Sequence, residues 1–274
     1  MKYNLVACDL DGTLLDDNSN LTEKNIDAIK NITSLGVHFV VVTGRTYFEI
    51  PDAVRNLECI KYIIYSDGAV AVNNNSKEVL FSEYFSNSLA AEIFNLLDEY
   101  DTMIELYENG YPVTDKEKIN EKSYEYYAID PNYRDVITQT RVGKDNLNEY
   151  VKNTEKTEIF NVFFKNLSER TECMRRLKDI DDIIFTTSMD NNIEIMPCNV
   201  SKGKALSRLC EMLNISWDKV ITAGDSKNDI SMFSASDVSV SPSNASGEIQ
   251  RISDDTGCSN NEGIADYIYK KYFA

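Results

Sequence analysis

The sequence predicts an α/β protein in which an open, mostly parallel β-sheet is interrupted by an inserted α+β domain. Short apolar runs alternate with helical segments at both ends of the 274-residue chain, whereas the central region is more amphipathic. A chain of this length also exceeds the roughly 100 to 200 residues of one common domain. We therefore expect two domains.

The first part of the chain, to about residue 75, alternates strands and helices. Strands are predicted for "YNLVACDL", "VHFVVVTG" and "IKYIIYSDGA", because continuous apolar, β-branched runs suit strands that are buried on both faces of a parallel sheet. Helices are predicted for "TEKNIDAIKNITSLG", with Thr22 as N-cap and Gly36 as stop signal, and for "YFEIPDAVRNL". This βαβαβ order is typical of a doubly wound, Rossmann-like sheet. The polar run "VNNNSKE" predicts the turn of a hairpin.

The same alternation returns after residue 190. Strands are predicted for "NIEIMP", "KVITAGDS" and "DVSVS", and helices for "SKGKALSRLCEML", "DISMFSAS" and "GIADYIYKKYF". Between the two ends lie amphipathic strands ("TMIELYENGY", "TEIFNVFFKN") and amphipathic helices ("SLAAEIFNLLDEY", "SERTECMRRLKDI"). We expect residues 1–83 and 191–274 to form one α/β core, and residues 84–190 to form an inserted α+β domain.

Composition excludes several classes of partner. The formal net charge of -17 argues against binding to nucleic acid or to an anionic membrane. No apolar run approaches the ~18 residues that a membrane span needs. The six cysteines form no CxxC pair, and His38 is the single histidine, so a zinc site is not expected. Scattered, reduced thiols predict a cytoplasmic protein.

Polar side chains follow four of the predicted strands. Asp9 and Asp11 follow the first strand, Thr43 the second, Asp67 the third, and Asp225 follows "KVITAG". Ligands bind at the carboxyl ends of the strands in open parallel sheets, so we expect these side chains at one edge. Clustered carboxylates repel unless a cation compensates, and Mg²⁺ combines carboxylates with water and phosphate oxygens. The sequence therefore predicts a magnesium and phosphate site.

Four ordered motifs carry a resemblance to a known family. The motifs "DLDGTLL" at Asp9, "TGR" at Thr43, "SKGKAL" around Lys202 and "GDSKND" from Gly224 resemble those of the haloacid dehalogenase-like (HAD) superfamily. The insert between the second and third motifs resembles the cap domain of Cof-type phosphatases. The resemblance implies a Mg²⁺-dependent phosphatase that hydrolyses a small phosphorylated metabolite, a sugar phosphate or a phosphorylated cofactor, through an aspartyl-phosphate. The alternatives are a phosphomutase or other phosphotransferase with the same intermediate, and a non-catalytic module that binds a phosphometabolite.

The resemblance also implies roles for individual residues. Asp9 is the nucleophile, while Asp11, held protonated by crowded carboxylate neighbours, donates a proton to the leaving group and then activates water. The Mg²⁺ ligands are the side chains of Asp9 and Asp225 and the backbone carbonyl of Asp11. Lys202 is the third catalytic residue and supplies positive charge to the phosphate and the nucleophile. The residues that bind the phosphate are Thr43, Gly44, Lys202 and Asn228, and Asp229 orients the metal ligands without binding the metal.

Three assignments have alternatives at this stage. Thr43 could serve only as the N-cap of a helix that begins at Arg45, or it could combine this role with phosphate binding. Lys204 is a rival to Lys202 for the catalytic lysine, although the "SKG" spacing favours Lys202. Arg45 belongs to the "TGR" motif, but an ion pair on a helix surface would explain it as well as a role near the substrate.

The chain departs from the Cof-type pattern at two positions. Asp67 stands where an asparagine is usual, and Pro242 stands where a small flexible residue is usual. Both changes put the substrate preference in doubt without touching the four motifs. Beyond the small substrate we expect neither a nucleic acid nor a membrane as a partner, and we expect a monomer or a weak homodimer.

Overall fold

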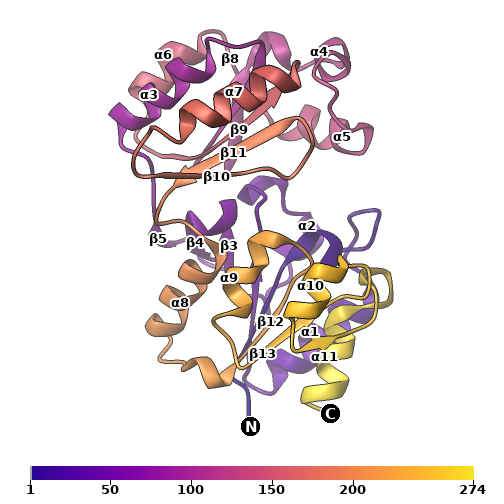
Figure 1. Ribbon diagram of the computed structural model, residues 1–274. Helices are drawn as coiled ribbons and strands as arrows, with labels where there is room; N and C mark the ends of the chain where they lie inside the picture. Colours follow the sequence, from indigo (N-terminus) through magenta and orange to yellow (C-terminus); the bar gives the residue numbers. More distant parts are fainter. Residues whose placement is uncertain (1) are drawn as a thin grey trace. The chain divides into compact units, whose positions relative to one another are not determined.

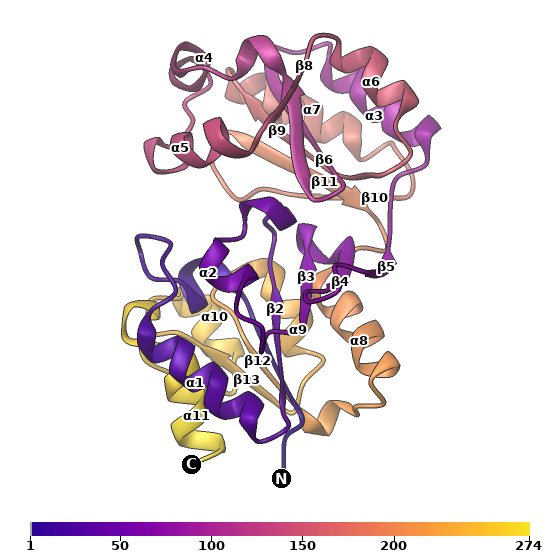
Figure 2. The same ribbon diagram turned by 180° about the vertical axis from the view of Figure 1, so that it is seen from behind.

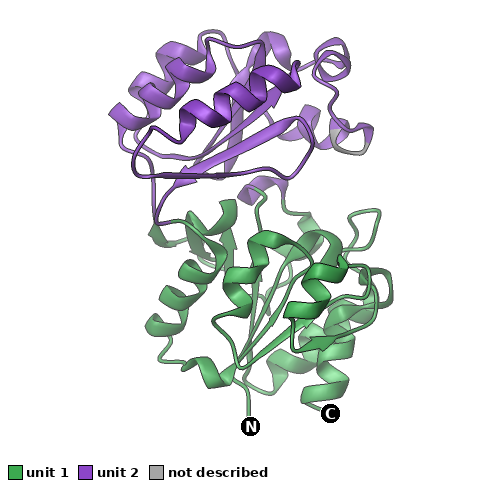
Figure 3. Cartoon of the chain, in the orientation of Figure 1, with its two compact units in different colours: residues 1–45, 50–82, 200–274 green, residues 46–49, 83–199 purple. Residues whose placement is uncertain are grey.

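The chain divides into two compact units. The computed structural model describes residues 2–274, apart from the side chains of residues 132 and 133. The larger unit comprises Met1–Arg45, Ile50–Ser82 and Val200–Ala274, and the smaller unit comprises Thr46–Glu49 and Glu83–Asn199 (Figure 3). The smaller unit is therefore an insertion that also includes a four-residue segment from the N-terminal part of the chain.

The larger unit is built on an eight-stranded sheet with the order β14-β13-β12-β1-β2-β3-β4-β5. Figure 1 labels β3, β4, β5, β12 and β13 among these strands. The strands from β14 to β3 are parallel, and β4 and β5 are added antiparallel to β3. The predicted hairpin around "VNNNSKE" is thus confirmed as the β4–β5 connection. The strands are β1 Leu5–Cys8, β2 His38–Val42, β3 Tyr62–Tyr65, β4 Val70–Asn73, β5 Val79–Ser82, β12 Val220–Ala223, β13 Val238–Ser241 and β14 Asp255–Thr256.

Helices cover both faces of this sheet. Leu5 and Ala7 of β1 pack in one apolar cluster with Leu206 and Leu209 of α8. Val6 and Cys8 are equally buried and point to the opposite face, since side chains alternate along a strand. On that face α1 and α11 pack against each other (Figure 2). The predicted doubly wound α/β fold is confirmed. The helices are α1 Glu23–Ser34, α2 Asp52–Arg55, α8 Lys202–Met212, α9 Ile230–Phe233, α10 Gly247–Ile252 and α11 Ile264–Tyr272.

Local sequence signals explain where these helices begin and end. The Thr22 hydroxyl accepts a hydrogen bond from the Asn25 amide at 3.3 Å, so α1 has its predicted N-cap. Gly36 follows the helix with φ 81°, which suits glycine. The single helix predicted over residues 47–57 is wrong. A 3-10 turn, Tyr47–Glu49, precedes the short α2, because Pro51 has no amide donor and disfavours helical backbone before it.

The smaller unit has a six-stranded sheet with the order β10-β11-β9-β6-β7-β8. Neighbouring strands are antiparallel except β7 and β8. One face packs α3, α6 and α7 against Ile104, Leu106 and Phe160, which confirms an α+β unit. Its elements are α3 Asn87–Leu97, β6 Thr102–Glu108, β7 Tyr111–Asp115, α4 Glu121–Tyr126, α5 Pro131–Thr140, β8 Val142–Lys144, α6 Leu147–Asn153, β9 Thr157–Phe164, α7 Leu167–Leu177, β10 Ile183–Thr186 and β11 Asn192–Pro197.

The strand "NIEIMP" was expected in the core, and this expectation is wrong. It forms β11, whose Ile193 lies opposite Val162 of β9 in the sheet of the smaller unit. Ile193 and Ile195 join the apolar cluster under the helices, while Glu194 between them does not. This alternation is typical of an antiparallel sheet with one covered face, not of a parallel strand buried on both faces. The assignment of the smaller unit as a cap stays a prediction.

Two further expectations concern the cysteines and membranes. The six cysteines are free thiols, three of them buried and three partly buried. Within residues 2–274, no helix combines the length and the apolar character that a membrane crossing requires.

Candidate active site

The carboxyl ends of four adjacent strands bring the predicted site residues together. In the order β12-β1-β2-β3, Asp225 follows β12, Asp9 follows β1, Thr43 follows β2 and Asp67 follows β3. The hydrogen-bond ladder between β1 and β12 continues to Asp9, because the Asp9 amide donates to the carbonyl of Ala223 at 2.9 Å. Residues that are far apart in sequence therefore lie at one edge of the sheet, as expected for this topology.

A buried lysine links two of the aspartates. Lys202 lies in the first turn of α8 with only 1% of its side chain exposed, and its Nζ donates to Asp9 Oδ1 and Asp229 Oδ1 at 2.7 Å each. Burial alone would lower the pKa of Lys202, but the charges of Asp229 and Asp9 raise it, so the side chain stays a cation. Lys204 is exposed. Of the two rival lysines, Lys202 is the one that contacts Asp9.

The protonation of Asp9 is governed by its surroundings. Burial raises its pKa well above the usual value, and the neighbouring charges of Asp229 and Asp225 act in the same direction. Lys202 opposes this rise through its charge and its hydrogen bond. A second cation beside Asp9 would therefore favour the ionised form that a nucleophile needs.

Asp225 packs against the loop that follows β1. Its Oδ1 accepts a hydrogen bond from Thr13 Oγ1 at 3.3 Å. Burial and the charge of Asp229 raise the pKa of Asp225 to about 6. Gly12 has φ 68°, and a Cβ at this position would lie 2.4 Å from Asp225 Oδ2. Only glycine lets the loop approach so closely. Gly12 and Thr13 both belong to the "DGT" motif, but neither had a predicted role.

Asp229 is fully engaged by protein donors. Its Oδ2 accepts from the backbone amides of Asp225 and Ser226, both at 3.0 Å, and its Oδ1 accepts from Lys202. Among the described residues, no hydrogen bond reaches Oδ2 of Asp9 or Oδ2 of Asp225. This arrangement agrees with the expectation that Asp229 orients its neighbours, while Asp9 and Asp225 present oxygens to a ligand.

The donor set suits a hard divalent cation. Carboxylate oxygens of Asp9, Asp225 and Asp229 lie within 4.8 Å of one another. With Asp67 included, four buried or partly buried carboxylates surround the single cation Lys202, so their full ionisation would leave three negative charges uncompensated. Mg²⁺ prefers carboxylate oxygens and usually keeps several waters. The residues present therefore fit Mg²⁺.

Asp11 has a different environment from the one expected. Its side chain is 42% exposed and lies against Arg45 instead of other carboxylates. Arg45 Nε donates to Asp11 Oδ2 at 2.8 Å, and Nη2 donates to Oδ1 at 2.6 Å. Arg45 thus forms an ion pair, but with Asp11 and not on a helix surface, while its role near the substrate stays a prediction. The expected crowding of Asp11 by carboxylates is wrong.

Thr43 and Arg45 belong to one tight loop. Thr43 is buried, and its Oγ1 accepts a hydrogen bond from the Arg45 amide at 3.1 Å. No helix begins at Arg45, where the described backbone leads into the 3-10 turn Tyr47–Glu49. The interpretation of Thr43 as the N-cap of such a helix is therefore wrong.

Asp67 occupies the space between Thr43 and Asn228. Its amide donates to the Thr43 carbonyl at 3.0 Å, and its Oδ1 accepts from Asn228 Nδ2 at 2.8 Å. A Cβ on Gly44 would lie 3.2 Å from both carboxylate oxygens of Asp67. Burial raises the pKa of Asp67, although Lys202 and Asn228 oppose the rise. Three of the four residues predicted to bind phosphate (Thr43, Gly44 and Asn228) thus gather around Asp67.

Asn244 had no predicted role, although it anchors the loop after β1. Its Nδ2 donates to the Gly12 carbonyl at 2.8 Å, and its Oδ1 accepts from the Asn260 amide at 2.9 Å. The turn that begins at Pro242 carries this residue, and the Ala245 amide donates to the Pro242 carbonyl at 3.1 Å. The turn "SPSNAS" therefore supports the loop that contacts Asp225.

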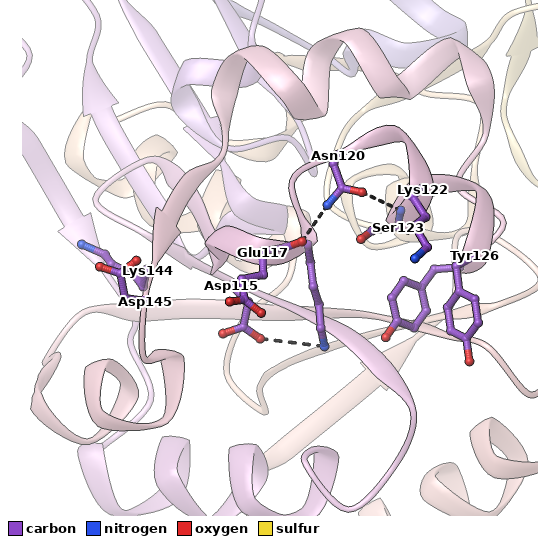
Figure 4. Close-up of a pocket in the computed structure, with 10 residues that line it drawn as sticks. Asp115, Glu117, Asn120, Lys122, Ser123, Tyr126, Lys144 and Asp145 are labelled. Carbon is purple, nitrogen blue, oxygen red and sulfur yellow. Dashed lines mark hydrogen bonds and ion pairs between the residues drawn. The ribbon is translucent and has the colours of Figure 1, made fainter.

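The smaller unit contains a separate cavity of about 600 Å³ (Figure 4). Acidic and basic side chains both line it, and several of its polar groups form ion pairs or hydrogen bonds with residues close to them in sequence. Lys118 pairs with Asp115 at 3.8 Å, and Asn120 donates to the Glu117 carbonyl at 2.6 Å. None of the predicted catalytic residues is among the described residues that line it. We assign it no role in catalysis.

Comparisons with known proteins agree with this geometry. Residues 6–268 match the family described as haloacid dehalogenase-like hydrolase. Phosphatase YwpJ of Bacillus subtilis is 27% identical over 277 residues, covering 95% of this chain and 97% of the relative. The 5-amino-6-(5-phospho-D-ribitylamino)uracil phosphatase YcsE of Bacillus subtilis is 24% identical over 250 residues, covering 91% and 88%. The crystal structure of TM0651 from Thermotoga maritima superposes with a TM-score of 0.82 at 25% identity, covering 99% and 98%.

Proposed function

This chain belongs to the haloacid dehalogenase-like hydrolases, an enzyme family, and we propose that it is a Mg²⁺-dependent phosphatase that hydrolyses a small phosphorylated metabolite through an aspartyl-phosphate. One observation carries the proposal: the Asp9 carboxylate is held by Lys202 at 2.7 Å beside Asp225. Similarity to proteins named phosphatases, YwpJ and YcsE, supports it. YcsE is named for a substrate that carries a phosphorylated ribityl group, which favours a small phosphorylated metabolite as the class of substrate.

The first step is attack by Asp9 on phosphorus. Lys202 binds Oδ1 of Asp9, so the second oxygen, Oδ2, is the one that forms the new P–O bond. The bond between phosphorus and the ester oxygen breaks, and a protonated Asp11 gives its proton to the leaving alkoxide. Arg45 donates to both oxygens of the Asp11 carboxylate, so the acid form of Asp11 requires that one of these two hydrogen bonds is released when the substrate binds.

The second step restores the enzyme. Asp11 accepts a proton from water, and the water oxygen attacks phosphorus of the aspartyl-phosphate. The P–O bond to Asp9 breaks, orthophosphate leaves and the Asp9 carboxylate is regenerated. Thr43, Gly44 and Asn228 hold the phosphate oxygens, and the charge of Lys202 stabilises the anionic transition state.

The side chains of Asp9 and Asp225 and the backbone carbonyl of Asp11 would hold Mg²⁺. When bound, the ion supplies positive charge that reduces the repulsion between a carboxylate nucleophile and a phosphate dianion. Asp229 fixes the loop that carries Asp225 through the amides of Asp225 and Ser226. In this proposal the smaller unit is the cap that selects the substrate, since the motif residues all lie in the larger unit.

Turnover of an aryl phosphate, with Mg²⁺ and with EDTA, tests the proposal. Wild-type protein should release orthophosphate only with Mg²⁺, and Asp9→Asn should lower kcat at least about 100-fold, in line with the 10²-fold or larger effects expected of catalytic groups. Rates unaffected by EDTA, or a folded Asp9→Asn variant with wild-type turnover, would contradict it. A panel of phosphorylated sugars, sugar alcohols and cofactors would then rank the substrates.

A further inference from the structure

Residues 46–49 belong to the smaller unit, whereas their neighbours in sequence on both sides belong to the larger one. The Phe48 ring stacks on Tyr111 with centroids 3.7 Å apart and ring planes 14° from parallel. The Phe48 amide donates to the Gly110 carbonyl at 3.0 Å. The segment that directly follows Arg45 is therefore fixed to the β6–β7 hairpin.

A buried ion cluster adds to this attachment. Arg141 donates to both carboxylate oxygens of Glu105, from Nε at 2.8 Å and from Nη2 at 2.9 Å, and its Nη1 pairs with Glu49. The three side chains are 5%, 0% and 8% exposed, in the order Arg141, Glu105, Glu49. Burial would raise the pKa of Glu49, but Arg141 and Thr46 hold it below its usual value, so Glu49 is ionised. A buried ion cluster gives little net stability compared with apolar packing, although it can select one geometry.

The cluster extends to Thr46, the residue that follows Arg45 in the sequence. Glu49 Oε2 accepts from the Thr46 amide at 3.0 Å and from the Thr46 hydroxyl at 2.8 Å. Thr46 is bonded to Arg45, which grips Asp11. The carbonyl of Arg45 accepts from the Ser66 amide at 2.9 Å, and the carbonyl of Thr43 accepts from the Asp67 amide at 3.0 Å. Hydrogen bonds and one peptide bond thus lead from Glu105 to the loop of Thr43 and Arg45.

We propose that Glu49 and Arg141 are positioning residues for the hydrolysis, acting on Asp11 through Thr46 and Arg45. They fix the 46–49 segment, and this segment fixes the backbone that presents Arg45 to Asp11. The inference rests on the proposed function for its catalytic consequence. Its structural part stands independently, because it concerns how tightly the loop of Thr43–Arg45 is held.

The test compares Glu49→Gln with Glu99→Gln as a matched control. Glu99 is another glutamate of the smaller unit that pairs with an arginine; Arg176 donates to its two carboxylate oxygens at 2.6 and 2.9 Å. For an aryl phosphate with Mg²⁺, Glu49→Gln should lower kcat about tenfold and change KM less than about twofold, because loss of one buried charge pair displaces Arg45 without removing a phosphate ligand. Glu99→Gln should change neither value more than about twofold, as expected of an exposed pair.

Hydrogen exchange separates this proposal from the proposed function. Glu49→Gln should speed exchange of the Ser66 and Asp67 amides about tenfold, since both donate to carbonyls of the held loop. Unchanged exchange at these two amides would overturn the inference, whatever the activity. If wild-type protein hydrolyses no phosphate ester, the proposed function fails and the exchange result alone decides the inference.

A double-mutant cycle tests the route through Arg45. In an Arg45→Met background, Glu49→Gln should change kcat less than about twofold, because the group through which it acts is gone. A full tenfold loss in that background would contradict the route. Should Glu49→Gln fail to fold, Arg141→Lys gives the same comparison, since lysine keeps the charge and loses the fork that joins Glu105 to Glu49.

Discussion

Asp225→Asn should stabilise the metal-free protein and abolish its stabilisation by Mg²⁺. The pKa of Asp225 is raised from 3.8 to about 6, with burial as the first cause and Asp229 as the second. A carboxyl with a raised pKa opposes folding when ionised, so its cost is present above pH 6 and vanishes as the pH falls below 3.8. Asparagine has nearly the same shape without the charge.

The two pKa values set the magnitude. Ionised Asp225 costs the folded state about 3 kcal/mol at pH 7 and about 1.6 kcal/mol at pH 5. Asp225 is only partly buried, so we expect Asp225→Asn to gain between about 1 and 3 kcal/mol at pH 7 in EDTA, and about half as much at pH 5. Mg²⁺ at 100 times its Kd should stabilise the wild type by about 2.7 kcal/mol, and the variant far less.

Urea unfolding in EDTA and in Mg²⁺, at pH 7 and pH 5, measures these differences in the free energy of unfolding. Asp218→Asn is the control, because Ser216 lowers the pKa of Asp218 and its removal should bring no gain in stability. The stability advantage of Asp225→Asn over wild type in EDTA should shrink by up to about 2.7 kcal/mol in Mg²⁺ at 100 times its Kd. An Asp225→Asn protein less stable than wild type in EDTA would refute the electrostatic reasoning. Equal stabilisation of both by Mg²⁺ would refute the assignment of Asp225 as a ligand.

Two further predictions concern the phosphate and the metal. Asp67→Asn should lower the inhibition constant of orthophosphate about tenfold at pH 7, since it removes a negative charge beside Asn228 and restores an amide donor; a weaker inhibition by orthophosphate would count against a phosphate site at this position. Ca²⁺ in place of Mg²⁺ should support less than about a tenth of the aryl phosphatase rate, because its larger radius and higher coordination number loosen the alignment of the oxygens. Comparable initial rates with the two ions would speak against this geometry.

The position of the site could be predicted from sequence because it follows from the topology. In a parallel sheet every strand delivers its carboxyl end to the same edge, so short motifs after buried runs suffice to gather Asp9, Asp225 and Thr43. The burial of Lys202 and exposure of Lys204 follow from helical spacing, since two residues apart on a helix point to different faces.

Features that depend on distant partners could not be predicted in this way. β11 is an apolar run like the core strands, and its pairing with β9 is decided by a sheet formed over 30 residues earlier in the chain. The partner of Asp11 is Arg45, 34 positions away, and no local pattern distinguishes this pair from a surface ion pair. The attachment of residues 46–49 to the smaller unit depends on Arg141, 92 positions from Glu49.

Peptide mass spectrometry of acid-quenched protein tests the central claim most directly. Wild-type protein mixed with Mg²⁺ and a reactive aryl phosphate, and quenched within the first turnover, should carry a phosphoryl group on Asp9. The Asp9→Asn variant should carry none at that position, because an amide cannot act as the nucleophile. A phosphoryl group on another residue, or efficient turnover with no phosphorylated peptide under conditions that preserve acyl phosphates, would contradict the account.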